Sequence, residues 1–93
     1  MNKLDPLLHQ ELRLAIISFL ANVEHANFKK LLEITEASKG NLSVQISKLQ
    51  GAEYVLVTKT FRDNYPHTQC SITKKGRVAL EIYIENLKKL LKL

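Results

Sequence analysis

The chain has 93 residues, of which 45% are hydrophobic, and its formal net charge is +5 at pH 7. This length allows one domain with a single small core, over residues 1–93, and the hydrophobic content excludes a disordered chain. The positive charge favours an anionic partner, most often nucleic acid.

The first predicted helix begins after Asp5, which can serve as its N-cap, with Pro6 at the first helical position. Apolar side chains then recur at helical spacing: Leu8, Leu12, Ile16, Phe19 and Leu20. Leu7, Leu14 and Ile17 are apolar on other faces, so we expect this helix to contact two neighbours.

Two shorter helices are predicted next, separated by a turn. Asn27 can cap a helix over residues 28–34, and Ser38 can cap a helix over residues 39–50 that ends at Gly51. The inward stripe of the third helix is formed by Leu42, Ile46 and Leu49.

The periodicity changes after this helix. Residues 54–61 are rich in β-branched and aromatic residues and predict a strand, residues 62–68 carry turn formers and predict a loop, and residues 69–72 predict the returning strand. Thr73 can cap a last helix over residues 74–91. The expected fold is therefore mainly α with a small β-hairpin: a helix-turn-helix followed by a wing and a final helix.

Several motifs resemble winged-helix transcriptional regulators of the MarR/ArsR-like kind. Residues 28–49, with GNLS at 40–43, resemble the helix-turn-helix of that family, and residues 9–17, 51–55 and 71–77 resemble its first helix, wing entry and strand-to-helix junction. The resemblance implies a homodimer that binds double-stranded DNA, with the third helix in the major groove and the wing on the flanking minor groove. Metal-sensing members carry clustered Cys and His ligands, and this chain has no such cluster, so metal sensing is not implied.

The third helix should leave one face free for DNA. Its predicted DNA-binding residues, with the cap, are Ser38, Lys39, Gly40, Asn41, Ser43, Val44, Gln45, Ser47 and Lys48. Asn41 and Gln45 are suited to base edges and Val44 to a thymine methyl group, while lysines would hold phosphates. An ordinary solvated helix face is the alternative, but such a face usually carries acidic side chains and this one has none.

Lysines lie in the predicted first turns of three helices, where the helix dipole disfavours a cation. They are Lys29, Lys30, Lys39, Lys74 and Lys75. A bound phosphate would reverse the sign of this effect, so we predict phosphate contacts at these positions and at Arg77, the alternative being tolerated surface charge. On the wing we predict contacts from Lys59, Arg62 and His67, with Arg62 reaching the minor groove or a phosphate. For His67 the alternative, which the sequence favours, is an ordinary exposed histidine.

The last helix, residues 74–92, carries more apolar surface than one monomer would cover. We expect it to pair with the first helix of a twofold mate. The predicted dimer interface is Leu14, Ile17, Leu80, Ile84, Leu87 and Leu91. A membrane-surface helix is the alternative, which Glu81 and Glu85 weaken.

Cys70 is the single cysteine, and its alternation with Ile72 predicts that it packs inward. His9 and His25 have no partners at ligand spacing, so we predict no metal and no cofactor. The absence of a signal-peptide pattern and of a ~20-residue apolar span predicts a cytoplasmic protein without a membrane partner.

The predicted function is sequence-specific binding of double-stranded DNA by a dimeric transcriptional regulator. The alternative is a winged-helix protein-interaction module that does not recognise DNA. We expect no enzyme, because the sequence shows no nucleophile–base pairing, phosphate loop or metal spacing. A cleft between the first and last helices leaves room for a small-molecule effector, but no residue identifies one.

Overall fold

The computed structural model describes residues 3–93. Its elements are α1 (Glu11–Leu20), β1 (Ala26–Asn27), α2 (Phe28–Thr35), α3 (Lys39–Gly51), β2 (Val55–Arg62), β3 (Tyr65–Ile72) and α4 (Lys74–Leu91). The three strands form an antiparallel sheet in the order β1-β3-β2. This confirms the predicted mainly α fold with a β-hairpin, to which the structure adds the short strand β1.

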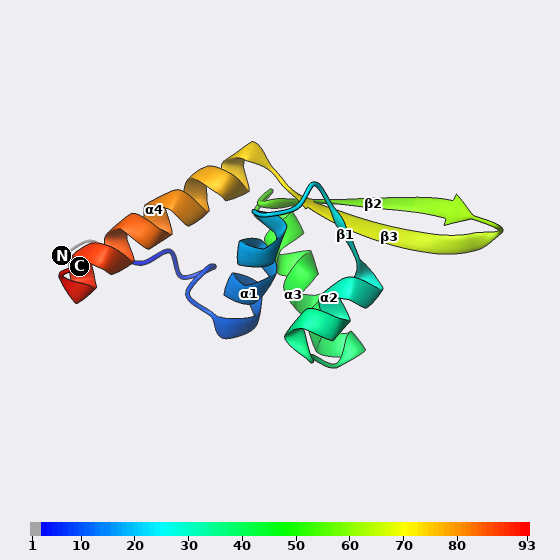
Figure 1. The fold of residues 1–93 in the computed structure, drawn as a ribbon, viewed down its shortest axis with the longest axis horizontal. Coiled ribbons are helices and arrows are strands. Elements are labelled where there is room, and N and C mark those ends of the chain that lie inside the picture. Colours follow the sequence, from blue (N-terminus) through cyan, green and yellow to red (C-terminus); the bar gives the residue numbers. More distant parts are fainter. Residues whose placement is uncertain (1–2) are drawn as a thin grey trace.

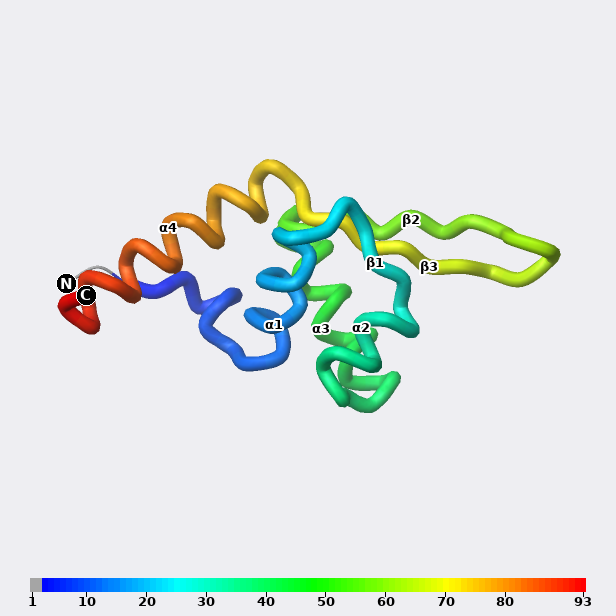
Figure 2. The backbone as a smooth tube through the Cα atoms, viewed as in Figure 1, coloured from blue at the N-terminus to red at the C-terminus, as the bar shows by residue number. Residues whose placement is uncertain are grey.

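The molecule is elongated, with principal extents of 51 × 25 × 21 Å. Helices α1, α2 and α3 pack together beneath the base of the sheet, the β2–β3 hairpin projects to one side, and α4 runs to the other (Figure 1). The backbone trace shows the first described residues beside the carboxyl end of α4 (Figure 2), where Asn86 Nδ2 donates to the Lys3 carbonyl at 3.3 Å. The hairpin and α4 thus extend from opposite sides of one small helical core.

The core lies where α1, α3 and the sheet meet. Its fully buried side chains are Leu8, Ile16, Ile17, Leu20, Leu31, Leu42, Leu49 and Cys70. The predicted inward stripe of the third helix and the inward packing of Cys70 are confirmed. Cys70 is fully buried and packs as a small hydrophobic group, and this burial raises the pKa of its thiol.

Three predicted helix caps are confirmed. Asn27 Oδ1 accepts a hydrogen bond from the Lys30 amide at 2.7 Å, and Ser38 Oγ accepts one from the Asn41 amide at 3.1 Å. Thr73 Oγ1 accepts from the Gly76 amide at 2.9 Å. Each cap satisfies a backbone donor that the first helical turn leaves unpaired, which fixes the starts of α2, α3 and α4.

The predicted start of the first helix is wrong. Helix α1 begins at Glu11, and its N-cap is Gln10, whose Oε1 accepts from the Arg13 amide at 2.7 Å. Asp5 instead caps one isolated turn: its Oδ1 accepts from the Leu7 amide at 2.9 Å and its carbonyl from the His9 amide at 2.8 Å. The extended conformation of Gln10, with φ −150° and ψ 129°, separates this turn from the helix.

The predicted seven-residue loop at the tip of the hairpin is also wrong. The strands continue to Arg62 and Tyr65, and only Asp63 and Asn64 connect them. Both connecting residues have a positive φ, 52° and 66°. Such left-handed pairs form the two-residue turns that match the twist of a hairpin, and Asp and Asn tolerate this conformation better than most residues. The wing is therefore longer and more regular than the sequence suggested.

The start of α4 is held against the base of the wing. The Tyr54 carbonyl accepts from the Thr73 amide at 3.0 Å, and Thr73 Oγ1 donates to the Glu53 carbonyl at 2.6 Å. A Cβ at Gly76 would lie 2.2 Å from the Tyr54 carbonyl oxygen, so only glycine fits there. This contact fixes the direction in which α4 leaves the sheet.

Two residues predicted for a dimer interface lie in the monomer core instead. Ile17 is fully buried and Leu80 is 7% exposed, because α4 packs one side against the helical core. Leu14 and Leu87 are half-buried against the same core, whereas Ile84 and Leu91 are exposed. Over residues 3–93, no helix combines the length and the hydropathy needed to cross a bilayer.

Candidate nucleic-acid interface

The exposed side chains of helix α3 are either uncharged or cationic. Its exposed residues are Lys39, Gly40, Asn41, Ser43, Val44, Ser47, Lys48, Gln50 and Gly51. None of the thirteen residues of α3 is acidic. The face is therefore compatible with a polyanion and carries side chains that can donate hydrogen bonds or make apolar contacts to base edges.

One predicted base-contacting residue, Gln45, points into the protein. It is 9% exposed, its Oε1 accepts from Arg13 Nη1 at 2.5 Å, and its Nε2 donates to Asn41 Oδ1 at 3.0 Å. Arg13 Nε also donates to the Leu7 carbonyl at 2.6 Å. Gln45 thus joins α3 to α1 and holds Asn41 in place, and it is not available to contact a base.

A groove of about 230 Å³ separates α3 from the wing. It is lined by Phe28, Ser43, Ile46, Ser47, Gln50, Val57, Lys59 and Thr68. Two predicted residues of α3, Ser43 and Ser47, therefore lie near the predicted wing cation Lys59. Gln50 and Thr68 were not among the predicted residues. Thr68 lies opposite Lys59 in the hairpin, and the predicted loop, which was too long, concealed this pairing.

A second hollow of about 350 Å³ connects the start of α2 to the wing. It is lined by Asn27, Phe28, Lys29, Pro66, His67 and Thr68. The structure thus brings Lys29 close to the groove, with Phe28 and Thr68 shared by both hollows. His67 lines the second hollow but pairs with Thr60 on the face of the hairpin opposite Lys59.

The register of the hairpin assigns its side chains to two faces. Val57 pairs with Cys70, Lys59 with Thr68, and Phe61 with Pro66, so these residues share the face that carries the core and the groove. Arg62 pairs with Tyr65 on the opposite face. Phe61, absent from the predicted site, therefore points to the same side as Lys59, whereas the predicted contact Arg62 does not.

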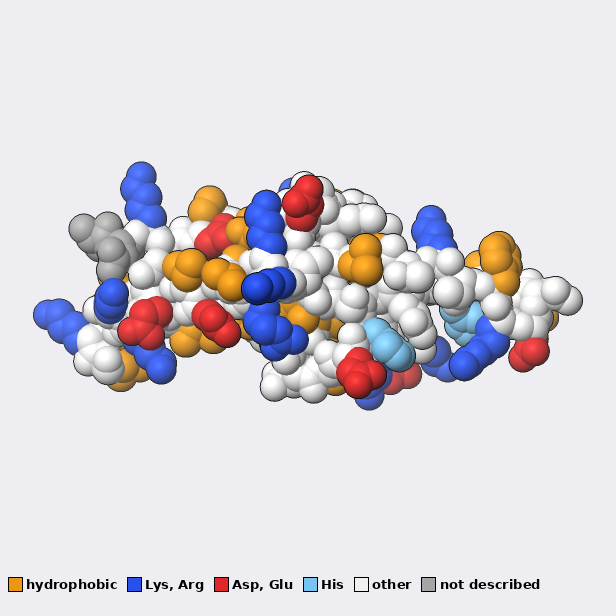
Figure 3. Space-filling view, turned by 90° about the horizontal axis from the view of Figure 1, so that it is seen from above, with side chains coloured by type: hydrophobic (Ala, Val, Ile, Leu, Met, Phe, Trp, Pro, Cys, Tyr) orange, Lys and Arg blue, Asp and Glu red, His pale blue; other side chains and the backbone are white. Residues whose placement is uncertain are grey.

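The lysines at the helix starts are all exposed, and no acidic residue occupies the first turn of α2, α3 or α4. Those of α4 lie outside both hollows. Lys75 Nζ is 3.9 Å from Glu53 Oε2, and Arg77 Nη1 donates to the Ala21 carbonyl at 3.1 Å. Seen from above, Lys and Arg side chains occur on both the α4 half and the wing, with hydrophobic side chains between them on the α4 half (Figure 3).

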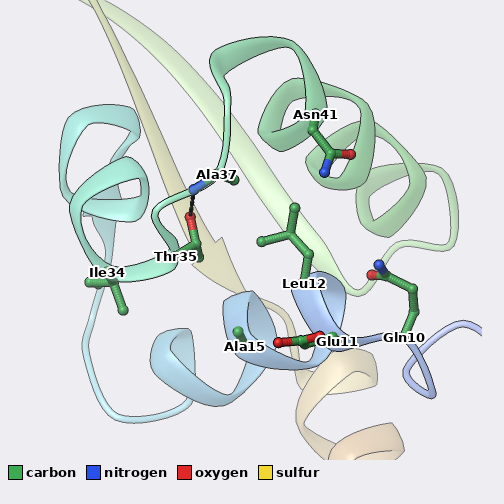
Figure 4. Close-up of a pocket in the computed structure, with 8 residues that line it drawn as sticks. All are labelled: Gln10, Glu11, Leu12, Ala15, Ile34, Thr35, Ala37 and Asn41. Atoms are coloured by element: carbon green, nitrogen blue, oxygen red, sulfur yellow. Dashed lines mark hydrogen bonds between the residues drawn. The ribbon is translucent and has the colours of Figure 1, made fainter.

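A third hollow, of about 430 Å³, lies between α1 and the α2–α3 turn (Figure 4). It is lined by Gln10, Glu11, Leu12, Ala15, Ile34, Thr35, Ala37 and Asn41. The Leu12 side chain points into its centre, and Asn41 lies at its rim. This position differs from the cleft between the first and last helices, which was the expected space for a small-molecule effector.

Comparisons with known proteins agree with this geometry. Residues 12–91 match the profile of a winged helix DNA-binding domain. An uncharacterised protein of Methanocaldococcus jannaschii is 32% identical over 80 residues, which cover 86% of this chain and 87% of that protein.

Solved structures share the fold. The structure of a transcriptional regulator homologue from Pyrococcus horikoshii OT3 superposes with a TM-score of 0.86 at 27% identity, covering 92% of this chain and 85% of the other. An ArsR family transcriptional regulator superposes with a TM-score of 0.62 at 16% identity, covering 92% and 84% of the two chains. At the latter identity the likeness concerns the fold alone.

Proposed function

Because the chain belongs to the winged helix DNA-binding domain family, which confirms its resemblance to MarR/ArsR-like transcriptional regulators, we propose that it binds specific duplex sequences as a homodimer. In this proposal α3 enters the major groove and the wing lies along the flanking minor groove.

The observation that carries the proposal is the acid-free exposed face of α3 beside a groove that ends on a wing lysine. Ser43 and Ser47 offer hydroxyl groups to base edges, and Val44, 51% exposed, offers an apolar contact to a thymine methyl group. Because Gln45 occupies the oxygen of the Asn41 amide, Asn41 would act through its Nδ2 as a donor.

Phosphate contacts are proposed where cations and helix starts coincide. Ser38, Lys39 and the first amides of α3 would hold one phosphate, and Lys29 and Lys30 at the start of α2 would hold another. Lys48, Lys59 and His67 would add contacts on either side of the helix. Lys74, Lys75, Arg77 and Arg62 remain predictions that neither hollow supports.

The proposed dimer uses the apolar surface that α4 leaves exposed. Ile84 and Leu91, seven residues apart and therefore on the same side of the helix, are 42% and 56% exposed. A twofold pairing of α4 helices would cover them, with Leu14 and Leu87 at the margin. It replaces the expected pairing of the last helix with the first helix of the mate, because Ile17 of that first helix is buried in the monomer. It would place two α3 helices about one DNA turn, roughly 34 Å, apart.

Selection of bound sequences from random duplexes, followed by matched double variants, tests the proposal. We expect Lys39→Ala with Lys59→Ala to lower affinity for the selected duplex and to reduce the slope of log affinity against log salt by about 4, because two phosphate contacts are lost in each protomer of the dimer. The control, Lys88→Ala with Lys89→Ala, removes the same charge from the far end of α4 and should leave the slope unchanged. If no sequence is enriched, or if both double variants bind as the wild type does, the result supports the alternative, a protein-interaction module that does not recognise DNA.

A further inference from the structure

The tip of the wing carries two aromatic side chains that the fold leaves in solvent. Phe61 is 79% exposed and Tyr65 is 71% exposed. Leaving a large apolar ring in water forgoes the stabilisation that burial would provide. Tyr65 has a hydroxyl group that water can hydrate, whereas Phe61 has no polar atom, so any apolar partner for the Phe61 ring would have to come from outside the monomer.

Phe61 lies on the side of the wing that faces the recognition groove. It follows Lys59 by two residues on the same strand and pairs with Pro66, so both flank the face lined by Lys59 and Thr68. Tyr65 lies on the other face, opposite Arg62. The two aromatic side chains are thus similarly exposed but point to opposite faces of the hairpin.

The charges around Phe61 favour a polyanion over an apolar protein surface. Lys59 and Arg62 lie within two residues of it, and the face that it shares with Lys59, Pro66 and Thr68 has no acidic side chain. Asp63, the acid at the tip, lies in the turn, where it would keep the tip itself away from a phosphate. An apolar ring beside Lys59 on this acid-free face can approach a duplex and reach the interior of a DNA groove.

The hairpin can hold such a ring in place. It pairs without interruption from Val55–Ile72 to Arg62–Tyr65 and closes through only two residues. A short connection of this kind restricts the position of the side chains next to it. Phe61 is therefore held at a fixed distance along the strand from Lys59 and the groove.

We propose that Phe61 inserts into the minor groove beside the site of α3 and partly unstacks one base step there. Apolar side chains used in this way kink the duplex, and pyrimidine–purine steps yield most easily. The deformability of the flanking DNA would then contribute to sequence selection at a step that makes no hydrogen bond to the protein. This inference rests on the proposed function, because it needs a duplex bound by α3.

The test uses the duplex that the wild-type chain selects, with 2-aminopurine placed at successive positions of each flank. Fluorescence of this base rises when it loses its stacking partner, and we expect one flanking step to respond on binding. Phe61→Ala should abolish the response and weaken binding about tenfold, whereas Phe61→Leu, which keeps an apolar wedge, should retain most of both. Tyr65→Ala is the matched control: it removes an equally exposed ring from the other face and should keep the fluorescent response.

The outcomes separate this inference from the proposed function. Wild-type binding to a selected duplex with no unstacked flank, or a response that survives Phe61→Ala, overturns the role of Phe61 and leaves DNA binding intact. A response lost equally in Tyr65→Ala also overturns it. If Phe61→Ala changes self-association in sedimentation and leaves DNA binding unaltered, the ring serves a protein contact instead, whereas failure to select any duplex rejects the proposed function itself.

Discussion

At the scale of single residues, Tyr54 joins the segment before α1 to the base of the wing. Its Oη donates to Asp5 Oδ2 at 2.6 Å. Burial, the hydrogen bond to Asp5 and the charge of that carboxylate, in this order, raise the pKa of Tyr54 to about 12 from its usual value of 10. The folded protein therefore favours the protonated phenol.

This pKa predicts a loss of stability at high pH. Below pH 10 the phenol is protonated in both the folded and the unfolded chain, so its contribution is fully present; between pH 10 and about 12 the unfolded chain ionises first and the contribution is lost. In urea unfolding from pH 8 to 12, the stability difference between wild type and Tyr54→Phe should shrink over that window. Tyr65→Phe, on the exposed wing, should track the wild type, and a Tyr54→Phe difference that stays constant with pH would contradict the prediction.

The residues predicted correctly from sequence are those whose role depends on near neighbours in the chain. The caps Asn27, Ser38 and Thr73 bond to an amide only three residues ahead, so sequence spacing suffices to identify them. Gln45 differs because its environment is set by Arg13, 32 residues away on another helix. Periodicity places Gln45 at the boundary of the inward stripe, and only the packing of α1 on α3 decides to which side it turns.

At the scale of elements, a lysine at the start of a helix should favour DNA binding but lower the stability of the fold. Lys39 lies in the first turn of α3, whose dipole is positive there, and no acidic residue of that turn offsets the repulsion. Lys48 lies in the last turn of the same helix, where a cation is favoured. The two exposed lysines thus carry the same charge on the same helix but interact with its dipole in opposite senses.

We therefore expect Lys39→Glu to raise the free energy of unfolding by about 0.3–1 kcal/mol and Lys48→Glu to lower it by a similar amount. Both substitutions change the charge equally and should weaken binding to the selected duplex. Urea unfolding at low salt, paired with a DNA titration, measures both effects. Equal shifts in stability for the two variants would show that overall charge, and not the helix dipole, determines the effect.

The elements themselves were predictable to different extents. The bounds of α2, α3 and α4 follow from caps and apolar periodicity within each segment. The start of α1 does not, because Asp5 and Pro6 form a plausible helix start whose isolated turn is held by Tyr54 from a distant part of the chain. The length of the wing was missed because Tyr65-Pro66 suggests a loop, although β3 is extended there and Pro66 pairs with Phe61.

At the scale of the whole molecule, the wing and α4 leave the helical core in opposite directions (Figure 1). The core covers only one side of α4: Leu80 and Tyr83 are buried, while Ile84 and Leu91, which are seven residues apart and form one stripe, remain exposed. A stripe of this kind at the end opposite the wing suits a partner that does not obstruct DNA, and a twofold copy would cover it with an identical stripe.

Ile84→Glu tests this arrangement, because it places a charge in the middle of the exposed stripe. We expect the wild type to sediment as a dimer and Ile84→Glu as a monomer, since an unpaired charge in an apolar interface must be desolvated. The monomer should lose affinity for a selected palindrome but bind a single half-site as the wild type does, because the α3 face is unchanged. Leu56→Glu, 58% exposed on the wing, is the control and should remain dimeric. A wild type that is monomeric at the concentrations that saturate the palindrome would mean that each half-site recruits its own chain, and the exposed side of α4 would then have no role in spacing the two recognition helices.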